Sequence, residues 1–364
     1  MVKLVLWTVI SMITLDAGIN RSFGTLENGL KPSQLTRYFD YGRSTESKLL
    51  RIIGSENANA ANIAKAGWYQ PVLNVVGVNA KPQVYMYGMS FSNHIGQIIA
   101  QETEDFGVQL YAGPGAPLNH SYAYYLRHRP YHKKGDVVIL GILASSIPHI
   151  NTMAHMTSSF EAPATHLYPR YSLDSNDDLI EKKISIYSLN EFREAMQNKE
   201  RWLSVKNRLS VGDSFYNDVV FSADFADKST YLSVFRRAWA AKQQQNTTNK
   251  YHDHKGFKNT DRMIEVTQKL VSEFALKARQ DGVVPMVILF NNRGFGDHLF
   301  SILKSVLTKR KIPYYSTHHN FPSTQLSNFL PDGHFKPEVD HLIALAVMKK
   351  INKFRQEKRY EGSL

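Results

Sequence analysis

Cysteine is absent from all 364 residues of the chain. Its absence excludes disulfides, Cys-ligated zinc, a thiol nucleophile and a lipid-modified cysteine at the amino end. No apolar run reaches the roughly 18 residues that a membrane-crossing helix needs, which excludes a polytopic membrane protein. Hydrophobic residues make up 43% and charged residues 21% of the chain, which excludes a disordered, collagen-like or coiled-coil protein. The length predicts one large or two modest domains.

Acidic residues are scarce relative to basic ones. The chain has 44 Lys and Arg against 32 Asp and Glu, a net charge of +12, which suits an anionic partner such as nucleic acid, an acidic glycan or a lipid surface. The densest basic cluster, at 349–359, is typical of a solvated helix face. Because the sequence has no zinc-finger spacing, no RNP-like motif and no basic repeat, we predict no nucleic-acid partner.

The amino end has the pattern of a targeting segment. Lys3 precedes an apolar stretch, Leu4–Leu15, of signal-peptide length. The following Asp16-Ala17-Gly18 is a poor cleavage site. We therefore predict that residues 1–18 are a signal peptide or a short membrane anchor, and that the protein is exported to the periplasm, cell envelope or medium. The alternative is a buried N-terminal strand or helix of a cytosolic protein.

Strand and helix patterns alternate over much of the chain. The runs 136–141 and 283–290 are continuously apolar, as expected for strands of a parallel sheet covered on both faces. Further strands are expected at 83–87 and 312–315, and helices over 95–100, 261–280, 297–309 and 339–354. The predicted fold is α/β, a three-layer sandwich with a central, mainly parallel sheet.

Three regions are expected after the targeting segment. Residues 19–80 are predicted to be a leader that packs on the main domain, which covers 81–360. An irregular insertion is predicted at about 150–260, where prolines and polar residues are frequent, as a lid or cap over the sheet's edge. Within it, Gln243–Asn249 is Gln-, Asn- and Thr-rich and is predicted to be a loop.

Ser90, Asp332 and His334 are the strongest set of candidate catalytic residues. A serine hydroxyl attacks only when a base takes its proton, and an imidazole base needs a carboxylate to orient it. Ser90 follows a predicted strand, where Gly88 permits a sharp turn and the next helix points backbone N–H groups at developing negative charge. Taken singly, a serine there is typical of a helix N-cap, and Asp332-Gly333 of a turn.

The order and position of four segments resemble the SGNH/GDSL hydrolase family, including its relatives that handle acyl groups on bacterial polysaccharides. The segments are Gly88-Met89-Ser90-Phe91, Gly113-Pro114-Gly115-Ala116-Pro117, Leu140–Ser146 and Asp332–Pro337. The resemblance implies a Ser90 nucleophile, a His334 base and an Asp332 acid. It also implies an oxyanion hole built from the N–H groups of Ser90 and of Gly113 or Gly115.

Two departures from the family pattern concern the oxyanion hole and the nucleophile. Met89 replaces the usual aspartate before the serine, and the third segment lacks the asparagine that donates to the oxyanion in the family. Loss of such a donor typically costs about 10²–10³ in rate. Asn119, Ser145 and Ser146 are candidate substitutes, and we take Asn119 as the side-chain donor.

Other motifs compete with this site. Val211–Phe215 contains Gly-Asp-Ser-Phe, but it follows no buried strand and would reverse the order of the segments, so we prefer Ser90 to Ser214. The chain has 14 histidines, among which His94 and His120 are expected near the site. The tightest pairs, at 252–254 and 318–319, have no third ligand at a firm spacing, so we predict no metal.

The tyrosines Tyr111, Tyr122, Tyr124 and Tyr125 suit either stacking on sugars or core packing, and we favour the core. The resulting hypothesis is an exported serine esterase or acyltransferase that needs no cofactor and acts on O-acyl groups, with O-acetyl favoured, of a carbohydrate or small ester. The alternative is a catalytically inactive protein of the same fold that binds glycan or envelope components. A lipase would need an apolar acyl groove that the sequence does not reveal.

Overall fold

The computed structural model describes residues 2–23, 34–54, 62, 64–69, 73–75 and 82–361. Parts of the predicted leader 19–80 lie outside this described set. The chain divides into two compact units. Unit 1 comprises Met1–Lys65, Ala154–His166 and Leu189–Thr248, and unit 2 comprises Ala66–Met153, Leu167–Ser188 and Asn249–Leu364. The amino-terminal segment therefore groups with the middle of the chain, whereas the sequence predicted a leader on the main domain.

Unit 2 is built on a six-stranded sheet in the order β1-β3-β2-β4-β9-β10. The strands are β1 (Leu73–Val75), β2 (Gln83–Gly88), β3 (Gly107–Ala112), β4 (Val137–Leu143), β9 (Val284–Phe290) and β10 (Tyr314–Ser316). Five strands run parallel, and β1 pairs antiparallel with β3. The sequence prediction of a mainly parallel sheet is confirmed, although β1 and β3 were not predicted.

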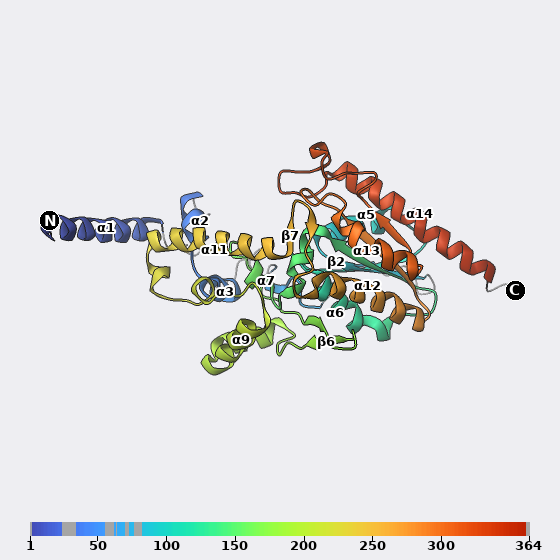
Figure 1. Cartoon of the computed structure of the whole chain (residues 1–364), viewed down its shortest axis with the longest axis horizontal. Helices are drawn as coiled ribbons and strands as arrows, with labels where there is room; N and C mark the ends of the chain where they lie inside the picture. The colour runs from blue at the N-terminus through green and yellow to red at the C-terminus, as the bar shows by residue number, and fades with distance from the viewer. Residues whose placement is uncertain are drawn as a thin grey trace. The chain divides into compact units, whose positions relative to one another are not determined.

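Helices cover both faces of this sheet (Figure 1). Helices α5 (Ser90–Glu102) and α14 (Pro337–Glu361) pack together on one face. Helices α6 (Leu118–His128), α12 (Met263–Gln280) and α13 (His298–Lys309) cover the other. Every connection between parallel neighbours crosses over through a helix, as parallel pairing requires. Unit 2 is therefore a three-layer α/β sandwich, as predicted.

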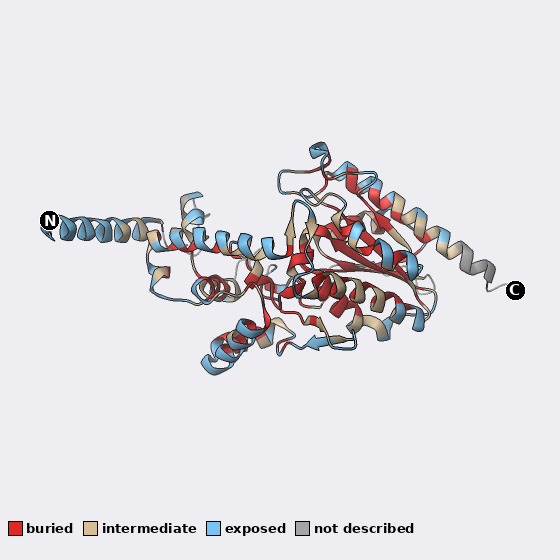
Figure 2. Ribbon diagram, viewed as in Figure 1, coloured by how far each residue is buried: buried red, intermediate tan, exposed pale blue. Residues whose placement is uncertain are grey.

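The sheet forms the centre of the core (Figure 2). All seven residues of β4 are buried, and six of the seven in β9. Burial on both faces explains why these segments read as continuous apolar runs rather than alternating ones. Under α6, Tyr111, Tyr122, Tyr124 and Tyr125 are at most 5% exposed, which confirms the core interpretation of these tyrosines.

Short elements complete unit 2. Two hairpins are formed by β5 (Arg170–Leu173) with β6 (Leu179–Lys182) and by β7 (His252–Asp253) with β8 (Gly256–Phe257). The 3-10 helices are the three-residue η1 (Arg129–Tyr131), η4 (Thr260–Arg262) and η5 (Leu326–Asn328), and the eight-residue η2 (Ala144–Asn151).

Unit 1 is helical among its described residues. Its elements are α1 (Val2–Phe23), α2 (Gln34–Asp40), α3 (Thr45–Gly54), α7 (His155–Ser158), α8 (Leu189–Gln197), α9 (Lys199–Gly212), α10 (Asp218–Phe221), η3 (Phe225–Lys228) and α11 (Thr230–Tyr251). The prediction of a loop at Gln243–Asn249 is wrong, because this segment continues α11. Propagating an established helix costs little per added residue, so the good helix formers Gln243–Gln245 and even the weaker Asn and Thr residues after them continue the helix.

Helix α1 contains the predicted targeting segment. It is 22 residues long, which is longer than the apolar stretch read from the sequence, and it is long and apolar enough to cross a membrane. The membrane-compatible window, Val2–Ser22, has none of its length buried in the protein. The alternative of a buried N-terminal element therefore does not describe α1, whereas a signal peptide or an anchor both fit it.

Two glycines of the central strands are needed because Ser92 of α5 lies against them. An added Cβ would lie 2.0 Å from Ser92 Oγ at either Gly88 or Gly141, and at Gly88 also 2.5 Å from Ser92 Cβ. We expect Gly88→Ala and Gly141→Ala each to lower the free energy of unfolding by about 1–3 kcal/mol. Ser92→Ala should largely rescue Gly141→Ala but not Gly88→Ala. Urea titrations of the single and double variants test this, and equal rescue of both would contradict the packing.

Candidate active site

Ser90 is the first residue of α5, directly after β2. Met89 precedes it in extended conformation and gives the helix no side-chain cap. The Asn93 N–H donates to Met89 O as the first turn of the helix closes. The N–H groups of Ser90, Phe91 and Ser92 therefore precede the helix's own hydrogen bonds, and they carry the partial positive charge of its amino end.

Gly88 permits the close approach of α5 to the end of β2. Its φ is not positive, so the turn into the helix needs no left-handed residue there, and the glycine is required because Ser92 Oγ occupies the space of a side chain. The close approach of Ser92 fixes the start of α5 against the end of β2. The position of the Ser90 hydroxyl is thereby set by packing as well as by the helix.

His334 lies within hydrogen-bond distance of this serine. Its Nε2 is 2.9 Å from Ser90 Oγ, although the two residues are 244 positions apart in sequence. The histidine belongs to the loop between η5 and α14, in which Gly333 has a φ of +90° and Leu330 N donates to His334 O at 2.7 Å. The ring stacks on Phe91 with centroids 4.9 Å apart. The imidazole is thus oriented by its loop and by α5 together.

Asp332 holds the other side of the same imidazole. Its Oδ1 lies 3.2 Å from His334 Nδ1 and also accepts the His334 backbone N–H at 3.1 Å. That backbone hydrogen bond, with the imidazole bond and charge, keeps the pKa of Asp332 below its usual value. The carboxylate is 65% exposed, whereas the imidazole is 27% exposed. The structure therefore brings together Ser90, His334 and Asp332, with an acid that remains open to water.

A second histidine–carboxylate pair adjoins the first. His94, one turn after Ser90 on α5, has its ring centroid 5.2 Å from that of His334. Its Nδ1 lies 3.1 Å from Oδ2 of Asp340, whose side chain is only 7% exposed. Burial raises the pKa of Asp340 to about 6, while His94 and His334 oppose that shift. His94 was expected near the site, but Asp340 was missed because nothing in the sequence links α14 to α5.

The predicted oxyanion donors differ in their environment. The Ser90 N–H lies at the open start of α5, as described above. The Gly113 N–H donates to Gly88 O at 3.3 Å and so extends the ladder between β3 and β2. Gly115 has a left-handed backbone conformation, with a φ of +58°. Asn119 is fully buried and its amide donates to the carbonyls of Thr152 and Pro169, which occupies both of its N–H groups.

Polar side chains also follow β4 and β9 at the carboxyl edge of the sheet. Asn292 Oδ1 accepts the Ser145 N–H at 3.1 Å, and its Nδ2 donates to Ser145 Oγ at 3.0 Å. Ser146 Oγ donates to Leu143 O. Asn292 follows a predicted strand directly, a position that could have marked it in the sequence. The carboxyl edge of a parallel sheet is where such folds bind their ligands.

The competing motifs lie elsewhere. Ser214 is in a half-buried turn after α9, in unit 1, and the preceding Asp213 accepts hydrogen bonds from Thr157 Oγ1 and the Phe215 N–H. His120 is buried and bonds the carbonyl of Gly67. Among the described residues, no group of three or more His, Asp or Glu side chains is arranged to hold a metal ion.

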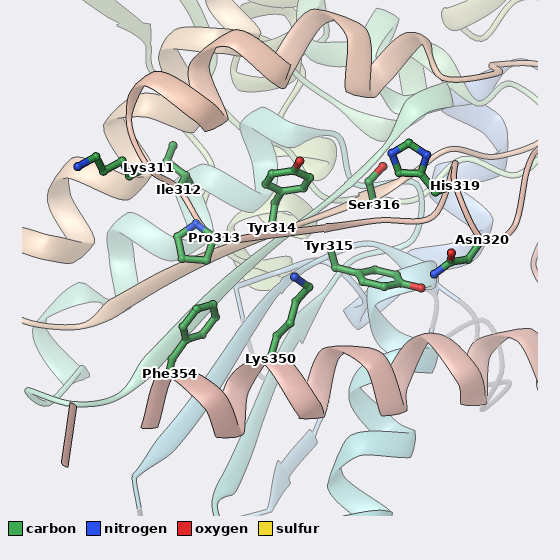
Figure 3. Close-up of a pocket in the computed structure, with 10 residues that line it drawn as sticks. All are labelled: Lys311, Ile312, Pro313, Tyr314, Tyr315, Ser316, His319, Asn320, Lys350 and Phe354. Carbon is green, nitrogen blue, oxygen red and sulfur yellow. The ribbon is translucent and has the colours of Figure 1, made fainter. Parts of the chain in front are cut away.

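A groove of about 530 Å³ lies along β10, the last strand of the sheet, and Figure 3 shows the residues that line it. Its wall is formed by Tyr314, Tyr315, His319, Lys350 and Phe354, among others, with α14 below the strand. Two strands, β4 and β9, separate β10 from the β2 strand that leads to Ser90. We therefore do not assign this groove to the acyl group.

No protein-family model matches the chain, and a search of curated proteins finds no relative.

Proposed function

We propose that the protein is a serine esterase or acyltransferase that acts on O-acyl groups, acetyl above all, carried by a carbohydrate. The observation that carries this proposal is the 2.9 Å contact between Ser90 Oγ and His334 Nε2 at the amino end of α5. A nucleophile, a base and an orienting acid in contact are the elements of serine acyl transfer. The family resemblance supports the same assignment.

The first half-reaction acylates the serine. Ser90 Oγ attacks the acyl carbonyl carbon while His334 Nε2 takes the hydroxyl proton, and the carbonyl electrons move to the oxygen. The helix-end N–H of Ser90 stabilises that oxyanion. When the oxyanion collapses, the bond to the sugar oxygen breaks, and His334 returns the proton to that oxygen. Asp332 stabilises the imidazolium throughout.

The second half-reaction frees the serine. A second hydroxyl attacks the acyl-serine, His334 takes its proton, and the Ser90 oxygen leaves and regains a proton from the same imidazole. Water as the acceptor gives hydrolysis, and a glycan hydroxyl gives transfer. Neither route uses a cofactor. The apolar helix α1 is consistent with a substrate in the cell envelope, and we include export and membrane attachment in the proposal.

Acetate release from p-nitrophenyl acetate and from O-acetylated glycans tests the proposal directly. Release by the wild-type chain, lost in Ser90→Ala, supports it. Adding a soluble acceptor glycan and measuring acetyl transfer to it distinguishes transfer from hydrolysis in the second half-reaction. No release above the uncatalysed rate on any of these esters would overturn the proposal.

A non-catalytic binding protein of the same fold is the second candidate. The observations that favour it are the occupied Asn119 amide, the Gly113 N–H bound to Gly88, and the exposed Asp332. On this alternative, acetylated glycan binds without turnover. Calorimetric titration of the same glycans into wild type and Ser90→Ala distinguishes the candidates, because equal affinity with no acetate release in either supports binding alone.

Ser214 gives a control for the choice of nucleophile. We expect Ser214→Ala to retain esterase activity within about twofold of wild type, since most half-exposed polar substitutions perturb a fold by little. The comparison with Ser90→Ala on one ester is the measurement. Loss of activity in Ser214→Ala at an unchanged thermal midpoint would indicate that Ser214 of unit 1, and not Ser90, is the nucleophile.

Asp332 is expected to matter less than the serine. Replacing a buried triad aspartate by asparagine costs about 10⁴ in kcat, but Asp332 is mostly exposed, and exposed ion pairs contribute little. We expect Asp332→Asn to lower kcat by about 10- to 100-fold with KM nearly unchanged. Steady-state kinetics of Asp332→Asn test this, with Asp105→Asn as the surface control. A loss as large as that of Ser90→Ala would contradict it.

A further inference from the structure

Helix α11 of unit 1 buries one stripe of residues and exposes another. Ser233, Arg236 and Ala240 are at most 5% exposed, and they form the stripe that packs into the unit. A second stripe, Leu232, Phe235 and Trp239, is apolar and yet 38–72% exposed. A helix in a soluble unit normally turns its apolar stripe towards the core, so the exposure of this one needs another explanation.

The second stripe lines a hollow on the surface of unit 1. Its other apolar walls are Phe225 of η3, which is 75% exposed, and Val219 of α10, which is 62% exposed. We call these five residues, Val219, Phe225, Leu232, Phe235 and Trp239, the aromatic face. Contiguous exposed apolar surface of this kind marks an interaction site, and aromatic residues are enriched where proteins meet the membrane–water interface.

Helix α1 is attached to the same elements that carry the aromatic face. Asp16 Oδ1 accepts the N–H of Tyr231, the residue before Leu232. Asn20 Nδ2 donates to the carbonyl of Lys228, the last residue of η3. Because both contacts lie within unit 1, a bilayer that receives α1 is brought to η3 and the start of α11.

Asp16 connects the insertion of α1 to the aromatic face. The membrane-compatible window of α1 runs from Val2 to Ser22, so Asp16 lies within the part of the helix that would enter the bilayer. Because Asp16 is hydrogen-bonded to Tyr231 of α11, inserting α1 as far as this residue brings the aromatic face to the membrane surface.

The charge around the aromatic face selects the lipid. Arg21, Lys228 and Lys242 are exposed on α1, η3 and α11. Asp224 and Asp227 both pair with Arg236, and Asp16 accepts the Tyr231 N–H, so the basic residues, Arg236 included, outnumber these three acids. Basic residues near a membrane surface each contribute about 1 kcal/mol towards anionic lipid.

We propose that the aromatic face of unit 1 rests on an anionic bilayer surface beside the inserted helix α1. Phe225, Phe235 and Trp239 enter the interface, and Lys228 and Lys242 lie at the headgroups. This contact is independent of the acyl chemistry proposed above, so either proposal can fail alone.

The absence of cysteine allows a direct depth measurement. Single variants Phe225→Cys and Phe235→Cys of the full chain are labelled with the polarity-sensitive dye NBD and reconstituted into phosphatidylcholine–phosphatidylglycerol vesicles. The matched controls are Val211→Cys and Leu203→Cys on α9, which are also exposed, at 83% and 52%, but lie outside the aromatic face.

We expect the dye at 225 and 235 to shift to the blue and to be quenched at least twofold by brominated lipid, while the dye at 203 and 211 is unaffected. Quenching should weaken when phosphatidylcholine replaces the anionic lipid. Emission at 225 and 235 equal to that of the controls would overturn the proposal. A blue shift without quenching by brominated lipid would also overturn it, because the face would then be covered by protein, for example a second copy.

Discussion

Ser90→Ala and His334→Ala are each expected to lower kcat by at least about 10³-fold, and the double variant by little more than either alone. The reason is that the hydroxyl and the imidazole act as one unit. The serine is a weak nucleophile without the base, and the base has no proton to move without the serine. The 2.9 Å distance between Ser90 Oγ and His334 Nε2 allows the proton to pass directly between them.

Steady-state kinetics on p-nitrophenyl acetate, with thermal midpoints of the three variants, measure the effect. Ser305→Ala is a suitable control, because it removes an exposed serine hydroxyl on α13, a helix that carries none of the candidate catalytic residues. Additive losses in the double variant, or activity retained in His334→Ala, would show that the two side chains do not act together.

Asp227→Asn is expected to destabilise unit 1 by about 3–5 kcal/mol, the usual cost of removing one partner from a buried ion pair. Asp227 is 8% exposed and its carboxylate accepts from the Ser44 N–H at 2.6 Å and from the Ser44 and Ser47 hydroxyls at 2.7 Å each. It also binds Arg236 at 2.5 Å. The substitution leaves a guanidinium that is 3% exposed with one remaining partner, Asp224.

The pH dependence of this network has a definite sign. Burial opposes ionisation of Asp227, but the hydrogen bonds from Ser44 and Ser47 and the charge of Arg236 outweigh it and hold its pKa below the usual value. A lowered folded pKa stabilises the protein above the unfolded Asp pKa of about 4. This stability is lost as the pH falls below that value and through the folded pKa.

Guanidinium titrations followed by tryptophan fluorescence test both expectations, because Trp202 and Trp239 lie in unit 1. The variant should unfold at lower denaturant than wild type at pH 7, and the difference should shrink towards pH 3. Asp224→Asn is the control, since Asp224 binds the same arginine but is 41% exposed. An equal loss in both variants, or a difference that persists at pH 3, would contradict the account.

The sheet could be predicted where burial leaves a local signal. Strands β2, β4 and β9 are covered on both faces, so their apolar runs are continuous and were found from the sequence. Strand β1 is three residues long and pairs at an edge, and β3 interrupts its apolar residues with Gln109. Such short or mixed segments gain their conformation from pairing, β1 with β3 and β3 with β2, which a linear pattern does not contain.

The site was predictable to the extent that its residues belong to ordered motifs. Ser90 and the Asp332–His334 pair could be joined because each follows a recognisable turn, and because their order matched a known pattern. Asp340 reaches His94 only through the packing of α14 against α5. Likewise, the hydrogen bonds from Ser44 and Ser47 join the start of α3 to Asp227 of η3 across 183 and 180 positions. The spacing of residues in the sequence indicates neither contact.

Trapping the acyl-enzyme tests the central claim most directly. The full chain is mixed with p-nitrophenyl acetate, quenched in acid after one turnover, digested and examined by peptide mass spectrometry. We predict a burst of p-nitrophenol with an acetyl group on Ser90, and neither in His334→Ala. An acetyl group on Ser214 instead, or no burst and no acetylated serine in the wild-type chain, would contradict the assignment of Ser90 as the nucleophile.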